Sequence, residues 1–180
     1  MLLVLDNGSL YTKNLILFLK EKNFKFEKHT PNLFDLTRIR NFNAIILSGR
    51  RVNEKKTNEI NSKIINYSMK NNTKLLGICY GAEIMALTLG GTIRKTPSLQ
   101  KGNEIVKIIE ENQISNNSLD VYESHNFEIS TLPKELKVLG SSENCRYEII
   151  QYQSKPIFGT QFHPEMTKDG CNLIEKFCLL

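Results

Sequence analysis

A cysteine flanked by two glycines follows a predicted strand, in the order Gly77-Ile78-Cys79-Tyr80-Gly81. A strand that turns sharply into a helix through such a segment forms a nucleophile elbow, here with sulfur in place of a serine oxygen. Small neighbours are needed because the turn is strained and crowded. A helix N-terminus favours a thiolate, so Cys79 is a candidate nucleophile. The alternative is a small, buried, apolar cysteine in an ordinary turn.

A histidine and a carboxylate follow a second predicted strand, in Gln161-Phe162-His163-Pro164-Glu165. Pro164 favours extended backbone at His163, and residues two apart in an extended chain project to the same side. A carboxylate beside an imidazole holds its tautomer and stabilises the imidazolium. His163 is therefore a candidate base with Glu165 as its orienting acid, whereas alone this segment could be a surface turn. With Cys79 the two residues form a candidate catalytic triad.

Short apolar runs alternating with amphipathic stretches must position these residues. In the first half we expect strands at 2–6, 24–27, 44–47 and 74–78, and helices at 10–22, 58–70 and 81–89. This alternation predicts a mostly parallel central sheet with helices on both faces. Apolar runs at 104–110, 119–123, 136–141, 147–152 and 156–162 predict antiparallel additions in the C-terminal half, before a last helix at 169–178. The expected fold is one α/β domain over residues 1–180.

The composition excludes several classes of protein. The net charge is +5, but the basic residues are scattered and form no block with interleaved aromatics, so we expect no nucleic-acid partner. No apolar run approaches the roughly 20 residues of a membrane-spanning helix, and the first residues lack a basic leader, which predicts a cytoplasmic protein without membrane association. The four cysteines, at 79, 145, 171 and 178, lack paired or zinc-binding spacing, which predicts free thiols and no metal site.

The chain resembles the class I, triad-type glutamine amidotransferases over nearly its full length. The resemblance rests on Asp6-Asn7-Gly8, Leu47-Ser48-Gly49, the elbow around Cys79, Ser124-His125 and the stretch from Gly159 to Glu165. Within the family, residues 4–8 and 141–145 are most similar to the amidotransferase subunit of two-subunit GMP synthase. The subunits of anthranilate and aminodeoxychorismate synthases are the next most similar.

The resemblance implies that Cys79 attacks the side-chain amide of L-glutamine to form a thioester, while His163, oriented by Glu165, moves the protons. It assigns substrate and oxyanion contacts to Gly49, Arg50, Tyr80, Glu83, Ser124, His125 and Asn126. The backbone amides near Gly49 and Tyr80 would form the oxyanion hole, whereas His125 is expected to structure a loop more than to catalyse.

The resemblance also implies a partner, because ammonia would pass to a separate ATP-dependent synthetase subunit. For a GMP synthase this is the ATP-pyrophosphatase subunit, which makes GMP from XMP. The chain has no phosphate-binding Gly-Lys-Ser/Thr loop, and the nearest candidate, Ser48-Gly49-Arg50-Arg51, lacks that ending. We therefore expect no cofactor in this chain, and ATP and Mg²⁺ on the partner.

Several positions depart from the family pattern. Glu83 replaces a glutamine, and an ionised carboxylate only accepts hydrogen bonds. It either contacts substrate, favouring an ammonium group or repelling a carboxylate, or it faces solvent or a basic partner. Arg50-Arg51 replaces Gly-Pro, which leaves three alternatives: a strained oxyanion loop, an anion-binding site and a solvated charge pair.

Two further departures are Ser9-Leu10 in place of Gly-Gln and Asn126-Phe127 in place of Gly-Asp. Together these changes keep two alternative functions open. One is the same thiol chemistry on another γ-glutamyl or amide substrate. The other is a catalytically silent regulatory subunit that keeps the fold.

Overall fold

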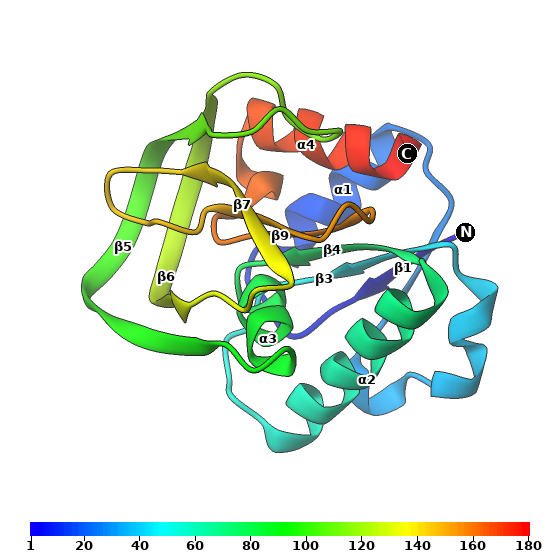
Figure 1. Ribbon diagram of the computed structural model, residues 1–180. Helices are drawn as coiled ribbons and strands as arrows, with labels where there is room; N and C mark the ends of the chain where they lie inside the picture. Colours follow the sequence, from blue (N-terminus) through cyan, green and yellow to red (C-terminus); the bar gives the residue numbers. More distant parts are fainter.

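A nine-stranded mixed sheet in the order β2-β1-β3-β4-β9-β8-β7-β5-β6 forms the centre of the computed structural model, which describes residues 1–180 (Figure 1). Five neighbouring strands are parallel: β2 (Phe26–His29), β1 (Leu2–Leu5), β3 (Ala44–Leu47), β4 (Lys74–Ile78) and β9 (Ile157–Thr160). The others are antiparallel: β8 (Ile149–Tyr152), β7 (Leu136–Ser141), β5 (Thr92–Ile108) and β6 (Leu119–Thr131). The predicted fold class, a parallel core with antiparallel additions, is confirmed.

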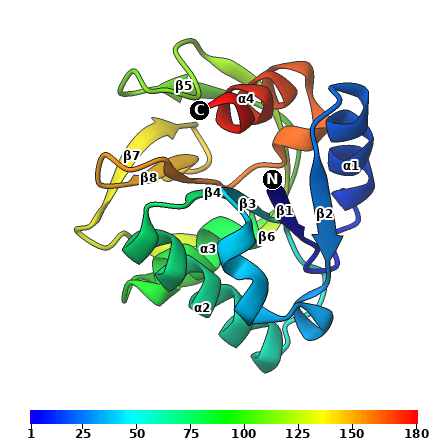
Figure 2. The ribbon, with the colours of Figure 1, turned by 90° about the vertical axis from the view of Figure 1, so that its right-hand side faces the viewer.

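Helices cover both faces of the parallel strands (Figures 1 and 2). One face packs against α1 (Thr12–Glu21) and α4 (Lys168–Leu179), and the other against α2 (Lys55–Asn71) and α3 (Tyr80–Thr88). Because alternate strand residues point to opposite faces, Val4 joins the first core and Leu5 the second. Short 3-10 turns lie at Pro31–Leu33, Leu36–Asn41 and Pro164–Met166. None of the helices has the length and apolarity required to span a membrane.

The carboxyl ends of β1, β3, β4 and β9 meet at one edge of the sheet, because these strands run parallel and in register. This edge is where open α/β sheets place their ligands. Buried side-chain hydrogen bonds hold the first two loops together. The backbone N–H of Asn7 donates to Ser48 Oγ over 2.9 Å, and Asn61 Nδ2 donates to Asn7 Oδ1 over 2.8 Å. The loops that follow β1 and β3 are thereby fixed beside the ends of β4 and β9.

The β5–β6 hairpin is much longer than the predicted strands at 104–110 and 119–123. The missed part of β5 contains Pro97 and Gly102 and lacks regular apolar alternation, so pairing with β6, not its own pattern, makes it a strand. The pairing register shifts between Lys95 and Gln100. As a consequence, His125 lies within strand β6 and not in the loop expected for it.

Candidate active site

Cys79 occupies a strained turn between β4 and α3, with φ of 50° and ψ of −104°. A positive φ is costly for a residue with a side chain, and such strain is common at nucleophile elbows. A Cβ placed on Gly77 would lie 2.5 Å from the carbonyl oxygen of Gly81, and one on Gly81 would lie 2.6 Å from that of Leu47. The backbone N–H of Cys79 donates to Thr160 O over 2.7 Å, which ties the turn to β9. The predicted elbow geometry is thus present.

His163 and Glu165 form a buried pair just beyond β9, with His163 Nδ1 3.0 Å from Glu165 Oε1. The backbone at His163 is extended, as expected, but Pro164–Met166 is a 3-10 turn instead of continuing extended. Pro164 suits the first position of such a turn because its φ is fixed. Since a carboxylate only accepts, Nδ1 is the donor, and Nε2 remains as the nitrogen that can exchange a proton.

Residues from two other loops position the imidazole of His163. A Cβ on Gly49 would lie 2.9 Å from His163 Cε1, so only glycine allows this approach without a shift. The ring of Tyr11 packs against the imidazole with centroids 4.5 Å apart, and its hydroxyl donates to Ser124 Oγ over 3.0 Å. Tyr11 was not predicted, because its partners lie more than 100 positions away and no local pattern marks it.

A cavity of about 280 Å³ opens next to Cys79. Six of the residues predicted from the sequence line it together with the thiol: Arg50, Tyr80, Glu83, Ser124, His125 and Asn126. Leu99 and Phe127, both exposed apolar residues of the β5–β6 hairpin, also line it and were not predicted. The cavity is large enough for an amino acid and is lined mainly by polar groups.

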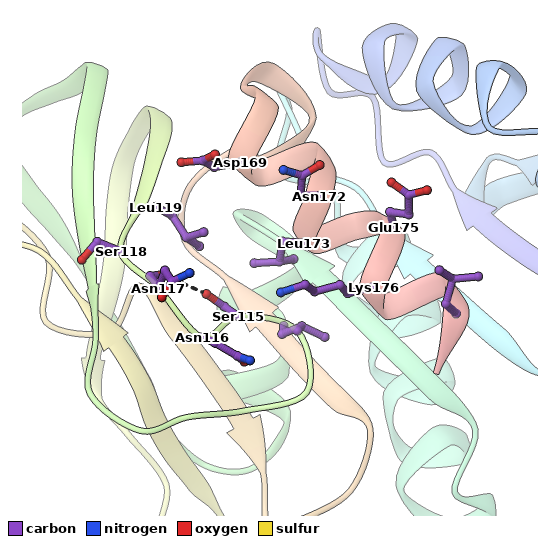
Figure 3. Close-up of a pocket in the computed structure, with 12 residues that line it drawn as sticks. Ser115, Asn116, Asn117, Ser118, Leu119, Asp169, Asn172, Leu173, Glu175 and Lys176 are labelled. Carbon is purple, nitrogen blue, oxygen red and sulfur yellow. Dashed lines mark hydrogen bonds between the residues drawn. The ribbon is translucent and has the colours of Figure 1, made fainter.

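A larger cavity of about 480 Å³ lies elsewhere, between residues 114–119 and α4. Figure 3 shows Asn172 and Lys176 of α4 on one side of it and Ser115 and Asn117 on the other. Its lining contains no cysteine or histidine, and its ionisable side chains are Asp169, Glu175 and Lys176. The cavity that combines a thiol with an imidazole is the smaller one.

Glu83 is buried in the wall of the Cys79 cavity, with 5% of its surface exposed. Gln161 Nε2 donates to Glu83 Oε1 over 3.3 Å, a contact that gives Gln161 a role the sequence did not reveal. Burial raises the pKa of the Glu83 carboxyl, while the Gln161 amide and the charges of Arg50, His125 and His163 act in the opposite direction. The alternative in which Glu83 faces solvent is wrong.

Arg50 lies over the ring of Tyr80, with its guanidinium carbon 4.0 Å from the ring centroid. Its Nη1 donates to Asn58 Oδ1 over 2.7 Å and to Asn53 Oδ1 over 2.8 Å. The φ of Arg50 is not positive, so the strained-loop alternative is also wrong. Arg50 is a positioned cation at the mouth of the cavity, which keeps the anion-binding alternative.

The electrostatic surroundings of Cys79 favour a neutral thiol. Burial raises the pKa of the thiol well above its usual value, and the carboxylates of Glu83, Glu123 and Glu165 raise it further. The backbone amide of Tyr80, at the start of α3, lowers it but does not compensate. Since the sequence had favoured a thiolate at this helix N-terminus, burial is the effect that wins. Attack by sulfur therefore requires a base to take its proton.

The remaining cysteines, Cys145, Cys171 and Cys178, are free thiols outside this cavity. No group of three or more His, Cys, Asp or Glu side chains is arranged to hold a metal ion. The reactive groups that the structure places at the site are the Cys79 thiol, the imidazoles of His125 and His163, and carboxyl groups.

The amino-acid sequence matches a known protein family over almost its whole length. The sequence profile described as "Glutamine amidotransferase class-I" matches residues 3–179. The chain belongs to this family of glutamine amidotransferases. The family match covers all of the elements that meet at the Cys79 cavity.

Relatives of this amidotransferase include GMP synthase proteins of two lengths. It is 32% identical to one subunit of the glutamine-hydrolyzing GMP synthase of Pyrococcus abyssi, covering 100% of this chain and 98% of that one. It is also 32% identical to the glutamine-hydrolyzing GMP synthase of Thermosipho africanus, but spans only 34% of its length. A crystal structure provisionally assigned as a GMP synthase subunit of Thermoplasma acidophilum superposes with a TM-score of 0.86 at 27% identity, covering 98% of this chain and 91% of that one.

Proposed function

We propose that this amidotransferase hydrolyses L-glutamine through Cys79, His163 and Glu165 and delivers the ammonia to a separate ATP-dependent synthetase subunit for the synthesis of GMP from XMP. The observation that carries this proposal is that the buried His163–Glu165 pair follows β9 and the strained Cys79 elbow follows β4, and these two strands are paired neighbours. The similarity to one GMP synthase subunit over its full length supports the choice of acceptor and of partner.

The proposed reaction follows from the neutral thiol. His163 Nε2 takes the proton of Cys79 as sulfur attacks the side-chain amide carbon of glutamine, and the backbone amides near Gly49 and Tyr80 are the candidate oxyanion donors. Each such donor contributes about 3–4 kcal/mol to the transition state. The His163 imidazolium then gives its proton to the leaving nitrogen, which departs as ammonia. In the second half, His163 activates water to hydrolyse the thioester, releasing glutamate and restoring the thiol.

The charges of the cavity suit an amino-acid zwitterion. Arg50 offers a cation at the mouth and Glu83 a buried carboxyl in the wall. A substrate carboxylate would therefore turn towards the guanidinium and its ammonium group towards Glu83. Another γ-glutamyl compound with the same amino-acid end would fit these charges equally well, which makes it the second candidate substrate.

The proposed function is tested by intact mass after incubation with 6-diazo-5-oxo-L-norleucine, followed by assay with the candidate synthetase subunit. We expect one adduct on Cys79 that excess glutamine blocks, and GMP carrying the amide nitrogen of ¹⁵N-glutamine when ATP and XMP are supplied. An adduct without nitrogen transfer would point to another acceptor or substrate. A stable complex without any adduct or turnover would favour the silent regulatory subunit.

Glu83→Gln is expected to make the thiol of Cys79 more reactive, because it removes a carboxylate that raises the thiol pKa. While the pH stays below the pKa of the thiol, lowering that pKa by one raises the thiolate fraction about tenfold. We therefore expect alkylation of Cys79 to be about three- to tenfold faster at pH 8. The measurement is the rate of iodoacetamide labelling of Cys79 by peptide mass spectrometry. Glu59→Gln, an exposed carboxylate paired with Lys63, is the matched control. Equal rates in both variants would contradict the assigned influence of Glu83.

A further inference from the structure

His125 lies between two hydrogen-bond acceptors on the buried face of β6. Its Nδ1 is 2.8 Å from the carbonyl oxygen of Phe127, and its Nε2 is 3.1 Å from Glu123 Oε2. The contact with Glu123 is short but is not aligned as a hydrogen bond, and it is an ion pair when the ring is protonated. A carbonyl and a carboxylate only accept, so each ring nitrogen faces a group that requires it to carry hydrogen. This arrangement selects the doubly protonated imidazolium.

The pKa of His125 agrees with this geometry. Burial acts to lower the pKa, but the ion pair with Glu123, the Phe127 carbonyl and the charge of Glu83 outweigh it, and the net direction is upward. The side chains of Glu123 and His125 are 7% and 2% exposed, so solvent does little to screen the pair. In His125 both ring nitrogens face an acceptor, whereas in His163 only Nδ1 is paired and Nε2 remains available.

A second buried carboxyl lies behind Glu123. Glu148 is fully buried, and its Oε1 accepts a hydrogen bond from Ser142 Oγ over 2.7 Å, while its Oε2 has no partner. Burial raises the pKa of Glu148 well above its usual value, and the neighbouring Glu123 raises it further. Two adjacent buried carboxyls resist ionising together, which is one cause of the raised pKa of Glu148. Of these two carboxyls, the one that contacts His125 is Glu123.

The charged groups around His125, Glu123 and Glu148 come from several elements. Those facing His125 are Glu123 on its own strand, Glu83 and Cys79 at the start of α3, and Arg50 and Arg51 in the loop after β3. Those acting on Glu148 behind it include Glu104 of β5 as well as Glu123. Among all of these, only Glu123 contacts His125 with a charged atom.

We propose that Glu123 is a positioning residue that keeps His125 as a fixed cation in the wall of the Cys79 cavity, where the imidazolium adds to the Arg50 guanidinium in attracting the carboxylate of the amino-acid substrate. This deepens the proposed function and rests on it for the identity of the substrate. With both nitrogens occupied, His125 cannot take the proton of the thiol, so its contribution is charge and not base catalysis. Loss of the positive charge on His125 should therefore weaken substrate binding and leave the chemical step largely intact.

The test is Glu123→Gln, which keeps the shape of the side chain and removes its charge. Ring ¹⁵N chemical shifts of labelled histidine should show His125 doubly protonated at pH 7 in the wild type. In Glu123→Gln we expect the neutral ring with hydrogen on Nδ1, held by the Phe127 carbonyl. We also expect KM for glutamine to rise about tenfold while kcat changes less than about twofold.

Two further variants separate this role from a general effect on folding. Glu128→Gln removes a buried carboxylate of the same strand that pairs with Arg94, and it should leave both His125 and KM unchanged. Glu123→Asp keeps the charge and should retain the doubly protonated ring, with KM close to that of the wild type. This conservative variant also provides the readout if Glu123→Gln does not fold.

The nuclear magnetic resonance measurement needs no turnover, so it distinguishes this assignment from the proposed function. A His125 that stays doubly protonated in Glu123→Gln overturns the positioning role even if the enzyme hydrolyses glutamine normally. A fall in kcat at unchanged KM overturns the role of the cation in binding. Loss of the charge in Glu123→Gln of a protein that proves inactive on glutamine still supports the positioning role and counts only against the proposed function.

Discussion

Cys79→Ala is expected to lower glutamine hydrolysis by at least about 10⁴-fold, because the cavity contains no other group that can form the thioester. The other three cysteines lie outside this cavity and cannot substitute. The measurement is glutamate release under saturating glutamine, with the synthetase subunit present.

Two controls separate the loss of the Cys79 nucleophile from a general loss of activity. Cys171→Ser changes a half-buried thiol on α4 and should leave kcat unaltered. With ammonium chloride in place of glutamine, the complex that contains Cys79→Ala should still form GMP at the wild-type rate, because only the ammonia source is lost. Glutamine hydrolysis by Cys79→Ala within tenfold of the wild type would remove Cys79 from the mechanism.

The sequence predicted the buried strands well because each is a continuous apolar run bounded by polar or glycine residues. The bounds of β3, β4 and β7 agree with the expected 44–47, 74–78 and 136–141. The bounds of helices and strands were predicted less well where contacts with another part of the chain, and not the local pattern, decide the structure. The first part of β5 is mostly polar. Helix α2 begins at Lys55, three residues before the expected start, because its polar first turn has no apolar periodicity.

The residues of the candidate site also divide into those that a local sequence pattern revealed and those that only the folded structure revealed. The elbow at Cys79 and the His163–Glu165 pair are local patterns, and local spacing was enough to find them. The contacts of Tyr11 with His163 and Ser124, and that of Gln161 with Glu83, join residues far apart in the chain. No pattern within one segment could reveal them.

The pKa values of the groups in the site depend on burial as much as on neighbouring charges. This dependence explains why the thiol of Cys79 differs most clearly from the sequence expectation. A helix N-terminus alone favours a thiolate at Cys79, but the folded chain surrounds the thiol with apolar contacts and three carboxyl groups. Burial likewise raises the pKa of Glu148 well above its usual value. Burial therefore favours the neutral thiol, and the proposed mechanism assigns to His163 the removal of the thiol proton.

Glu165→Gln is the variant that tests this dependence on His163. The uncharged amide can turn either its oxygen or its NH2 group towards Nδ1, so it no longer fixes the tautomer of His163, and the imidazolium formed during attack loses its counter-charge. The comparable change in a Ser-His-Asp triad lowers kcat about 10⁴-fold, and we expect a loss of about 10³- to 10⁴-fold here. The measurement is glutamate release, together with iodoacetamide labelling of Cys79 in the same preparation.

The labelling should move in the opposite direction to turnover. Glu165 is one of the carboxylates that raise the thiol pKa, so its neutralisation should leave alkylation at least as fast as in the wild type. A protein that had merely unfolded around the site would not keep glutamine protection of this labelling.

A matched control exists on β2, where Glu27 and His29 form another carboxylate–imidazole pair two residues apart, with His29 Nε2 2.9 Å from Glu27 Oε2. This pair is partly exposed and far from the elbow, so Glu27→Gln should leave kcat unchanged. If Glu165→Gln kept kcat within about threefold of the wild type, Glu165 would be a structural neighbour of His163, and the proposed triad would reduce to a Cys79–His163 pair.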